Sequence, residues 1–481
     1  MANDNRLKKG TAATFHQNQK KKLSLLNRVL FWAVPTVAFS ILIGVIWAGF
    51  SMRPIADDYG MGASAGLGIF GAVEFWWQNW SGSLSTIFLQ VLLVGLPLYY
   101  LPWPVASLVP FLASSMLTSG LLTWIVATNL QGFSSERQKW FGGTVFFPLA
   151  MVMWWGFWWV SAVTTETDSS ENLWPRAIAF WQIVNVGYVA VIVIAVWIWL
   201  VLEKNFERFR NPVALFAFSA AGLIVGFMGP VVALSSAIFA GAIVAAQFFF
   251  GPAKNRTFYL ATSVGMISLI TAAVVDNLSP GSSRRSEALA DPSIRELAVG
   301  LIQLPPKATM DFWLSISGIG TVVSFVTLGG FAVAMSWAGA GFSARKLARL
   351  GSGLLGFALV LAVVSRLGQL FSYEAWWHVM GVRTLVWLAT SCLGIALGAY
   401  LQHRLRSNLL VPASLIFTVT GLALSGSSLG LMAYEVQSRL SAWNEGPAST
   451  TGIADIEIDW VNQGWLELNG GRKIPIEREP H

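Results

Sequence analysis

Runs of about 20 apolar residues recur along the whole chain, and they constrain its fold more than any other feature. A helix of that length can cross the hydrocarbon core of a bilayer, where every backbone polar group must be satisfied within the segment. The pattern therefore predicts an all-α polytopic membrane protein. The candidate spans lie at residues 30–50, 83–101, 104–129, 143–164, 178–202, 212–229, 231–250, 257–275, 311–336, 351–371, 383–402 and 409–433.

Composition supports this class and excludes several others. Of the 481 residues, 55% are hydrophobic and 11% are charged, whereas a soluble chain carries about 25% charged residues. The single cysteine, Cys392, has no partner in the chain, which excludes an internal disulfide framework and a zinc–cysteine cluster. The formal charge of +7 comes from short basic clusters between apolar runs, so it indicates membrane orientation and no nucleic-acid partner.

The basic clusters predict the orientation of the chain. The first 29 residues are rich in lysine and arginine, so we expect the N-terminus to be cytoplasmic and residues 51–82 to lie outside a plasma (inner) membrane. The loops Glu203–Arg210, Lys254–Arg256, Arg345–Arg349 and His403–Arg406 are also basic and read as cytoplasmic. A cleaved signal peptide is the alternative for the N-terminus, but the first apolar run is too long for one and no small-x-small site follows it.

Twelve simple crossings do not satisfy all of these loops, because from a cytoplasmic N-terminus they would place both Arg137 and Arg208 outside. The segment 104–129 is the predicted cause, since it is long and carries Pro104 and Pro110. It would form a re-entrant pair or two short spans. We therefore expect about 11–13 crossings.

The predicted organisation has three parts. Residues 1–29 form a basic cytoplasmic N-terminus, and residues 30–433 form the transmembrane domain. Two extracytoplasmic loops, 51–82 and 276–310, belong to that domain. Residues 434–481 form a small extracytoplasmic tail, in which alternating stretches such as "IADIEIDWV" suggest short β elements.

Asp57 and Asp58 are adjacent acids directly after the first span. Two neighbouring carboxylates repel each other, so one pKa rises unless a cation lies nearby. Transfer from a phosphate-linked donor needs a carboxylate to take the acceptor proton and guanidinium groups to hold the departing phosphate. The arginines predicted on the same side that we assign to the phosphate are Arg284, Arg285, Arg366 and Arg383.

The remainder of the first loop is amphipathic. Its apolar residues recur at helical spacing, with Glu74 and Gln78 between them, which predicts a helix lying along the membrane interface. Its tryptophans, Trp80 among them, read either as interfacial belt residues or as platforms on which a sugar stacks. Tyr59, Glu74 and Trp80 are the pocket candidates from this loop.

A third outer loop contributes further pocket candidates. "SYEAWWHVMGV" carries Trp376, Trp377 and His378 just before Arg383. Arg366 lies within the preceding apolar run, where an ionisable group costs about 2.5–3.5 kcal/mol at the helix centre and less near the surface. These residues predict a phosphate and sugar pocket between two helices.

Several of these stretches occur in a recognisable order. "ADDYG" ends the first span, "NWSGSLS" opens the second, "NLSPGSSRR" occupies 277–285 and "SAWNEGPASTTGIADIEI" follows the last span. Together they resemble GT-C type integral membrane glycosyltransferases, in the bacterial branch near the O-antigen glucosyltransferases. In the "APGN…R" loop of that family, Ser279 stands here for alanine and Ser282 for asparagine.

The resemblance implies a donor, an acceptor and roles. The donor would be a polyprenyl-phosphate-linked sugar, and the acceptor a glycan, lipid or protein of the cell envelope at the membrane surface. Asp57 or Asp58 would act as the base. We favour Asp57, with Asp58 orienting it or holding a divalent cation, Mg²⁺ or Mn²⁺, if the reaction uses one. Arg284 and Arg285 would face the donor phosphate, on a turn shaped by Pro280 and Gly281.

The predicted reaction is hexosyl or pentosyl transfer with inversion, because a single displacement needs one base and no enzyme nucleophile. Two other functions stay open. A polysaccharide polymerase or ligase would use the basic loop 276–310. A lipid or solute transporter would use polar residues at mid-membrane depth, such as Gln182 and Asn185.

Overall fold

The computed structural model describes most of the apolar part of the chain. Structural statements below concern the residues that it describes, which are 34–50, 57–131, 141–163, 183, 185–205, 211–250, 256–283, 295, 298–300, 302–303, 306, 318–337, 341–368, 378–405 and 410–445.

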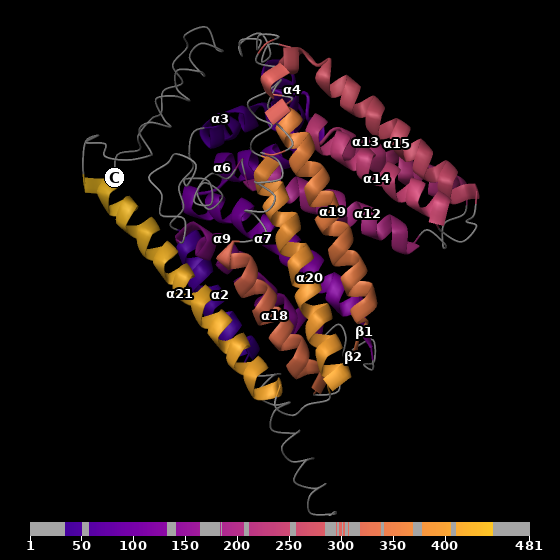
Figure 1. Ribbon diagram of the computed structural model, residues 1–481. Coiled ribbons are helices and arrows are strands. Elements are labelled where there is room, and N and C mark those ends of the chain that lie inside the picture. Colours follow the sequence, from indigo (N-terminus) through magenta and orange to yellow (C-terminus); the bar gives the residue numbers. More distant parts are fainter. Residues whose placement is uncertain are drawn as a thin grey trace, which may run out of the picture.

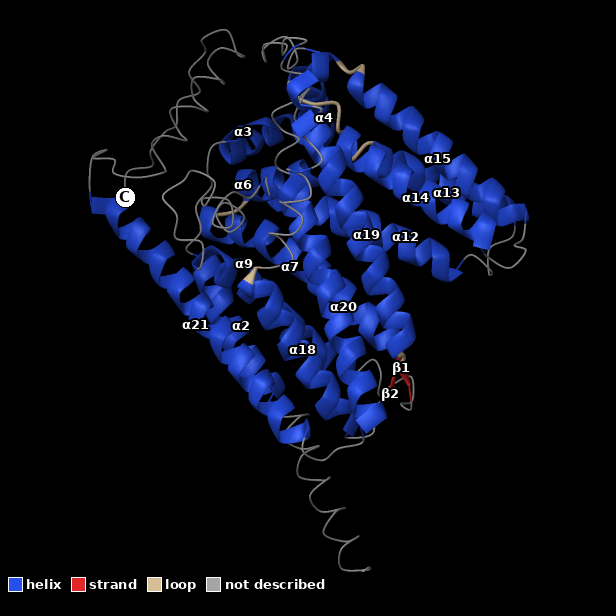
Figure 2. Ribbon diagram, viewed as in Figure 1, coloured by secondary structure: helices blue, strands red, loops and turns tan. Residues whose placement is uncertain are grey.

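The described chain is almost entirely helical (Figure 2). Its α-helices are α2 (Val34–Phe50), α3 (Asp57–Ser64), α4 (Gly68–Asn79), α5 (Leu84–Gln90), α6 (Leu96–Tyr100), α7 (Trp103–Thr128), α9 (Phe147–Val163), α12 (Val191–Asn205), α13 (Asn211–Gly226), α14 (Pro230–Phe250), α15 (Arg256–Asn277), α18 (Ile319–Trp337), α19 (Ala344–Gly368), α20 (Val379–Leu405) and α21 (Leu410–Glu445). The other elements are the 3₁₀ turn η2 (Ala65–Leu67), the π-helical segments η3 (Val91–Gly95), η4 (Phe141–Phe146) and η6 (Asn185–Ala190), and the strands β1 (Leu130–Gln131) and β2 (Gly341–Phe342).

The all-α polytopic prediction is confirmed. Seven helices among the described residues are long and apolar enough to cross a membrane, and five shorter apolar helices accompany them. Each predicted span coincides with one of these helices. The last helix, α21, extends to Glu445, beyond the predicted end of the last span at residue 433. The stretches expected to form β elements in the tail lie outside the described residues.

The helices form an elongated bundle with two distinct ends (Figure 1). At one end β1 pairs antiparallel with β2, opposing Leu130 to Phe342, next to the start of α19. We call this the sheet end. The short helices α3 and α4 lie at the other end, as do the end of α15 and the start of α20 (Figure 1). We call this the carboxylate end, after the buried acids Asp58 and Asp276 described below.

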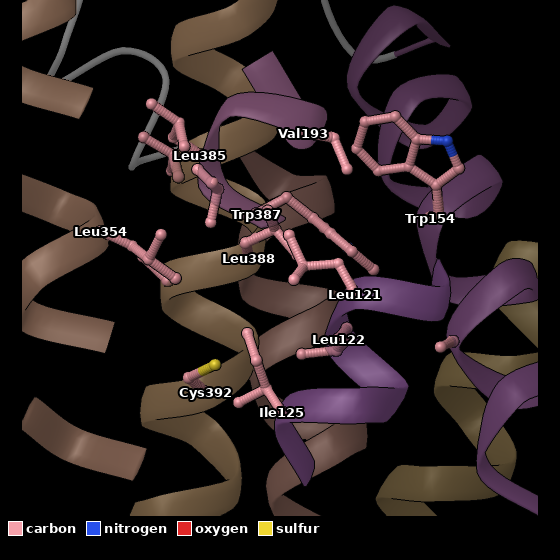
Figure 3. Close-up of a cluster of buried hydrophobic side chains, with 14 of the residues drawn as sticks. Leu121, Leu122, Ile125, Trp154, Val193, Leu354, Leu385, Trp387, Leu388 and Cys392 are labelled. Carbon is pink, nitrogen blue, oxygen red and sulfur yellow. The ribbon is translucent and has the colours of Figure 1, made fainter. Parts of the chain in front are cut away.

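Tryptophan and aliphatic side chains fill the centre of the bundle. Trp154 of α9 packs edge-on against Trp387 of α20, with ring centroids 5.0 Å apart. Leucines and valines from α7, α12, α19 and α20 lie around this pair (Figure 3). The indole N–H of Trp387 donates to Ser324 Oγ at 3.2 Å, so this buried polar atom has the partner that a water-free interior requires.

Small residues allow several helices to pack backbone to backbone. A Cβ placed on Gly329 of α18 would lie 3.0 Å from the carbonyl oxygen of Gly394 on α20, and Gly398 lies against the Gly329 carbonyl. Such close approach is the usual basis of helix association in membranes, where lipid tails are as apolar as leucine.

The prediction for 104–129 is wrong. This segment is the single 26-residue helix α7, with Pro110 inside it. Proline is tolerated there because its neighbours can satisfy the freed backbone groups. Asn129 at the end of α7 accepts a hydrogen bond from Ser343 N at 3.0 Å, which places that end at the sheet end.

The irregular segment is instead the one before it, residues 84–100. It is broken into α5, η3 and α6. At its start Ser85 N donates to the Phe227 carbonyl at 3.0 Å, and near its end Tyr99 lies against Gly66 of η2. Both contacts are at the carboxylate end. The segment therefore starts and finishes at the same end of the bundle, which removes the conflict between the basic loops.

Candidate functional site

Asp58 is fully buried in the first turn of α3. Its Oδ1 accepts a hydrogen bond at 2.9 Å from the backbone N–H of Ile183, which precedes η6 and α12. Asp58 thus binds, from a distant part of the chain, the backbone two residues before η6.

Other contacts fix the same segment. Gln90 Nε2 donates to the Ile183 carbonyl at 3.2 Å, and Gly187 of η6 lies against that Gln90 amide. Ile183 is therefore held at its N–H by Asp58 and at its C=O by Gln90. The sequence gives no sign of this arrangement, because the three residues are far apart in the chain.

The amphipathic first loop is helical, as predicted, and its tryptophans are used inside the protein. Trp76 of α4 is 4% exposed, and its Nε1 donates to Ser64 Oγ of α3 at 2.7 Å. Trp80, half-buried, meets the Trp76 ring edge-on at 6.4 Å. The belt interpretation is therefore wrong for Trp76, which folds α4 back onto α3. The exposed side of α4 carries Phe70, which is 83% exposed.

A second buried acid, Asp276 at the end of α15, is 1% exposed. Its Oδ2 accepts a hydrogen bond from Ser83 Oγ at 3.2 Å, and its backbone carbonyl accepts from Ser282 Oγ at 3.0 Å. Ser282 Oγ in turn accepts from Gly82 N at 3.1 Å and from Ser279 Oγ at 3.0 Å. We call these five residues, Gly82, Ser83, Asp276, Ser279 and Ser282, the Asp276 junction.

Two glycines make this junction possible. A Cβ on Gly82 would overlap the carbonyl oxygen and the carboxylate of Asp276. A Cβ on Gly281 would lie 2.5 Å from the Trp77 carbonyl oxygen and 2.7 Å from Ser81 N. Gly281 lies in a helical turn and is not among the described glycines with positive φ, which are Gly68 and Gly229. Its role is therefore close approach between two chain segments, which corrects the predicted turn-shaping role.

His378, one residue before α20, is buried at 7% exposure. Its ring meets Tyr188 of η6 edge-on at 5.0 Å, and among the described residues its Nδ1 has no hydrogen-bond partner. Burial lowers the pKa of His378 to about 3, because desolvation disfavours the charged imidazolium. His378 is therefore neutral near pH 7.

The predicted cationic residues within the spans also lie at the carboxylate end. Arg366 is half-buried in the last turn of α19, and Arg383 is half-buried in the first turns of α20. Gly381 joins the two helices to η6, because it lies against Leu361 of α19 and the Tyr188 carbonyl. The structure thus brings the ends that carry Arg366, Arg383 and His378 together.

Glu74 is placed differently from the other candidates. It is exposed on α4 and accepts a hydrogen bond from Gln78 Nε2 at 3.1 Å, as an ordinary pair one helical turn apart. Its assignment to a substrate pocket stays a prediction.

Several candidates lie outside the described residues. They are Arg284, Arg285, Trp376 and Trp377, and the side chains of Asp57 and Tyr59. In the part of the chain that is described, no group of three or more histidine, cysteine, aspartate or glutamate side chains could hold a metal ion.

Sequence reasoning missed Asp276. A single acid at the end of an apolar run resembles an ordinary solvated helix flank, and only its position next to "NLSPGSS" marks it. The structure shows that this acid joins that stretch to "WSGSLS", about 200 residues earlier.

The comparisons with known proteins give no relative. No family model, no curated protein and no solved structure matches this chain.

Proposed function

We propose that this protein is a membrane glycosyltransferase that moves a sugar from a polyprenyl-phosphate donor to a glycan, lipid or protein acceptor of the cell envelope. The proposal takes the carboxylate end as the reaction site and as the extracytoplasmic side of the plasma (inner) membrane. The basic residues in the first turns of α19 and in the last turn of α20 would then be cytoplasmic, as would the N-terminus.

One observation carries the proposal. "NWSGSLS" and "NLSPGSS", the two stretches of the glycosyltransferase resemblance that the structure describes most fully, pack directly on each other at the Asp276 junction. The chain continues from Ser283 into Arg284 and Arg285. An acid-bearing first loop next to an arginine-bearing loop is the pairing that transfer from a sugar phosphate requires.

The neighbouring acids take different roles in this proposal. Asp58 is buried and bound to Ile183 N, so it suits the positioning of α3 rather than proton transfer or cation binding. Asp57, the residue before it, acts as the general base. Because the described residues contain no set of metal ligands, we derive no step through a metal.

The reaction is a single displacement. The acceptor oxygen attacks the anomeric carbon while its proton passes to the Asp57 carboxylate. The bond between that carbon and the phosphate oxygen breaks, and the polyprenyl phosphate leaves with its electron pair. Arginine charge stabilises the leaving phosphate, from Arg284 and Arg285 and from Arg366 and Arg383. One displacement inverts the anomeric configuration.

The test is a transfer assay with Asp57→Asn. Membranes containing the protein are incubated with radiolabelled polyprenyl-phosphate sugars, and label is followed into new products. General-base catalysis contributes about 10²–10⁴-fold, so we expect Asp57→Asn to lower transfer by that factor. Glu203→Gln, which changes an exposed acid near the end of α12, should leave the rate unchanged. Transfer at the wild-type rate by Asp57→Asn would refute the assigned base.

A transporter is the second candidate, because one observation favours it. Asn185 is 3% exposed and opens the π-helical segment η6, and interrupted helices with buried polar groups line transport sites. Label that crosses sealed vesicles without entering a new compound would support transport. A ladder of lengthening products in the same assay would indicate a polysaccharide polymerase or ligase.

A further inference from the structure

We propose that Asp276 is a positioning residue that docks residues 276–283 on the first loop and so determines how the protein binds its phosphate-linked donor. The inference rests on the proposed function for its second half only. Its first half, the docking itself, concerns the chain alone and is tested without any substrate.

The hydrogen bonds of the Asp276 junction run between the two segments. From the first loop, Ser83 Oγ donates to the Asp276 carboxylate and Gly82 N donates to Ser282 Oγ. Within the later segment, Ser279 Oγ accepts from Ser282 N at 3.2 Å and donates to Ser282 Oγ. The hydroxyl of Ser282 is thus oriented by three neighbours, so it presents a fixed acceptor to Gly82.

The two segments pack tightly against each other around the Asp276 junction. The surfaces of Gly82 and Asp276 are in contact, and Gly281 lies under the backbone of Trp77, Trp80 and Ser81. Each segment contributes a glycine that fits against the backbone of the other. This reciprocal fit specifies one register between the segments, because a shift by a residue would replace a glycine with a side chain at the contact.

The carboxylate is the group best suited to hold this register. It is 1% exposed, and an ionised acceptor forms a stronger hydrogen bond than a neutral one. Ser83 is also the residue that precedes the first turn of α5, where negative charge is favoured by the helix dipole. Asp276 therefore binds the start of α5 through both a hydroxyl and the field of the helix.

The location explains the functional consequence. Ser283, the last residue described before Arg284, hydrogen-bonds back to the Ser279 carbonyl through its N–H at 3.1 Å. The next two residues are Arg284 and Arg285, assigned above to the donor phosphate. Asp276 itself contacts neither donor nor acceptor in this proposal. It acts through the arginines, by fixing where the chain enters their segment.

The first experiment measures docking by limited trypsin digestion of the full-length protein in detergent. Trypsin cleaves after Arg284 and Arg285, and the loss of a hydrogen bond to a buried charge shifts an opening equilibrium by about ten- to one-hundred-fold. We expect Asp276→Ala to raise the cleavage rate there by about that factor. Cleavage at Arg345 and Arg349, near the sheet end, is the internal reference and should stay constant.

Two variants separate docking from a general loss of fold. Glu74→Ala removes an exposed acid of the first loop and should leave cleavage unchanged. The double variant Ser83→Cys/Asp276→Cys replaces the hydrogen bond with a disulfide, and oxidation should restore slow cleavage while a reducing agent removes the protection. The native Cys392 is buried in α20 and does not compete. Equal cleavage at residues 284–285 in the wild type and Asp276→Ala would overturn the proposal.

The second experiment asks what docking does for the reaction. With the transfer assay above, Asp276→Ala should raise the donor KM by about tenfold or more, with a smaller change in kcat, and the oxidised double-cysteine variant should recover the wild-type KM. A fall in kcat that the disulfide does not rescue would show that Asp276 takes part in the chemistry and would overturn the positioning role. If no variant transfers sugar but trypsin protection follows the junction, the docking stands and the proposed function fails.

Discussion

The two buried acids of this protein, Asp58 and Asp276, solve different structural problems at the same end of the bundle. Asp58 accepts a hydrogen bond from the backbone N–H of Ile183. Ile183 packs in an apolar cluster that includes Met61, Trp76 and Ile87. Asp276 lies among serine hydroxyls and glycine backbone. One acid binds the backbone of a residue that packs in an apolar cluster, and the other belongs to a network of polar groups.

The difference teaches how a membrane protein can bury a charge. At Asp58 the compensation comes from a backbone N–H of a distant part of the chain, at Ile183. At Asp276 it comes from hydroxyl donors and from close backbone packing. Helix α5 links the sites, since Ser83 precedes it and Gln90 ends it. Seven residues at 1.5 Å per residue make the rise between these ends about 10 Å.

The largest expected effect tests the hydrogen bond between Asp58 and the Ile183 backbone. Asp58→Ala leaves the Ile183 N–H buried without its acceptor, and an unsatisfied donor together with the loss of a charged hydrogen bond costs about 3 kcal/mol. Asp58→Asn keeps an acceptor oxygen of the same size and should cost about 1 kcal/mol. Unfolding in mixed detergent micelles measures both. Equal losses for the two variants would show that the charge matters more than the hydrogen bond.

The sequence predicted the helices well because span length is set by the bilayer. Every apolar run appears as a helix, and the conflict among basic loops was real. It was assigned to the wrong segment. The prolines of α7 are visible in the sequence and drew attention there, whereas the breaks at η3 arise from packing of residues 84–100 against α3, which no local pattern reveals.

The candidate site was predictable only in part, for a related reason. Adjacent acids stand out in an apolar sequence, so Asp58 was found. Its partner, a backbone amide at Ile183, has no residue signature at all. Asp276 was missed because its partners are small residues, serine and glycine, which occur throughout membrane helices. Long-range contacts made by backbone and hydroxyl groups are the information that one sequence does not carry.

The second prediction concerns His378, which contacts Tyr188 of η6. Its pKa is about 3 in the folded protein and about 6.5 unfolded, so the unfolded state binds more protons between these values. Stability therefore falls as the pH drops below 6.5, by about 2 kcal/mol between pH 6.5 and pH 5. His378→Gln, which does not titrate, should lack this component. Parallel pH dependence of unfolding in the wild type and His378→Gln would contradict the neutral, buried state.

The third prediction tests the close packing of Gly82 against Asp276 by substituting two glycines. Gly82→Ala forces a methyl group into Asp276, and overpacking of this kind costs about 1–3 kcal/mol. Gly120→Ala is the matched control, because a Cβ there meets nothing within 4 Å in the interior of α7. It should stabilise by about 0.5–1 kcal/mol through helix propensity. If thermal unfolding in detergent shifts in the same direction for both variants, the tight fit at Gly82 does not limit stability.

The smallest expected effect compares two hydrogen bonds near the start of α5, one to a charged acceptor and one to a neutral acceptor. Ser83 Oγ donates to a carboxylate, while Thr86 Oγ1 donates to the neutral Met228 carbonyl at 3.0 Å. Both hydroxyls bridge the start of α5 to the ends of helices from the α13–α15 group, so deletion of either one changes the same interface.

Hydrogen bonds to charged groups contribute about 1.5–3 kcal/mol, and neutral ones about 0.5–1.5 kcal/mol. Ser83→Ala should therefore destabilise by about 1.5 kcal/mol and Thr86→Val by about 0.5 kcal/mol. Because valine preserves the shape of threonine, a loss for Thr86→Val as large as that for Ser83→Ala would mean that the interface depends on hydrogen-bond number, and that the buried charge of Asp276 adds nothing to it.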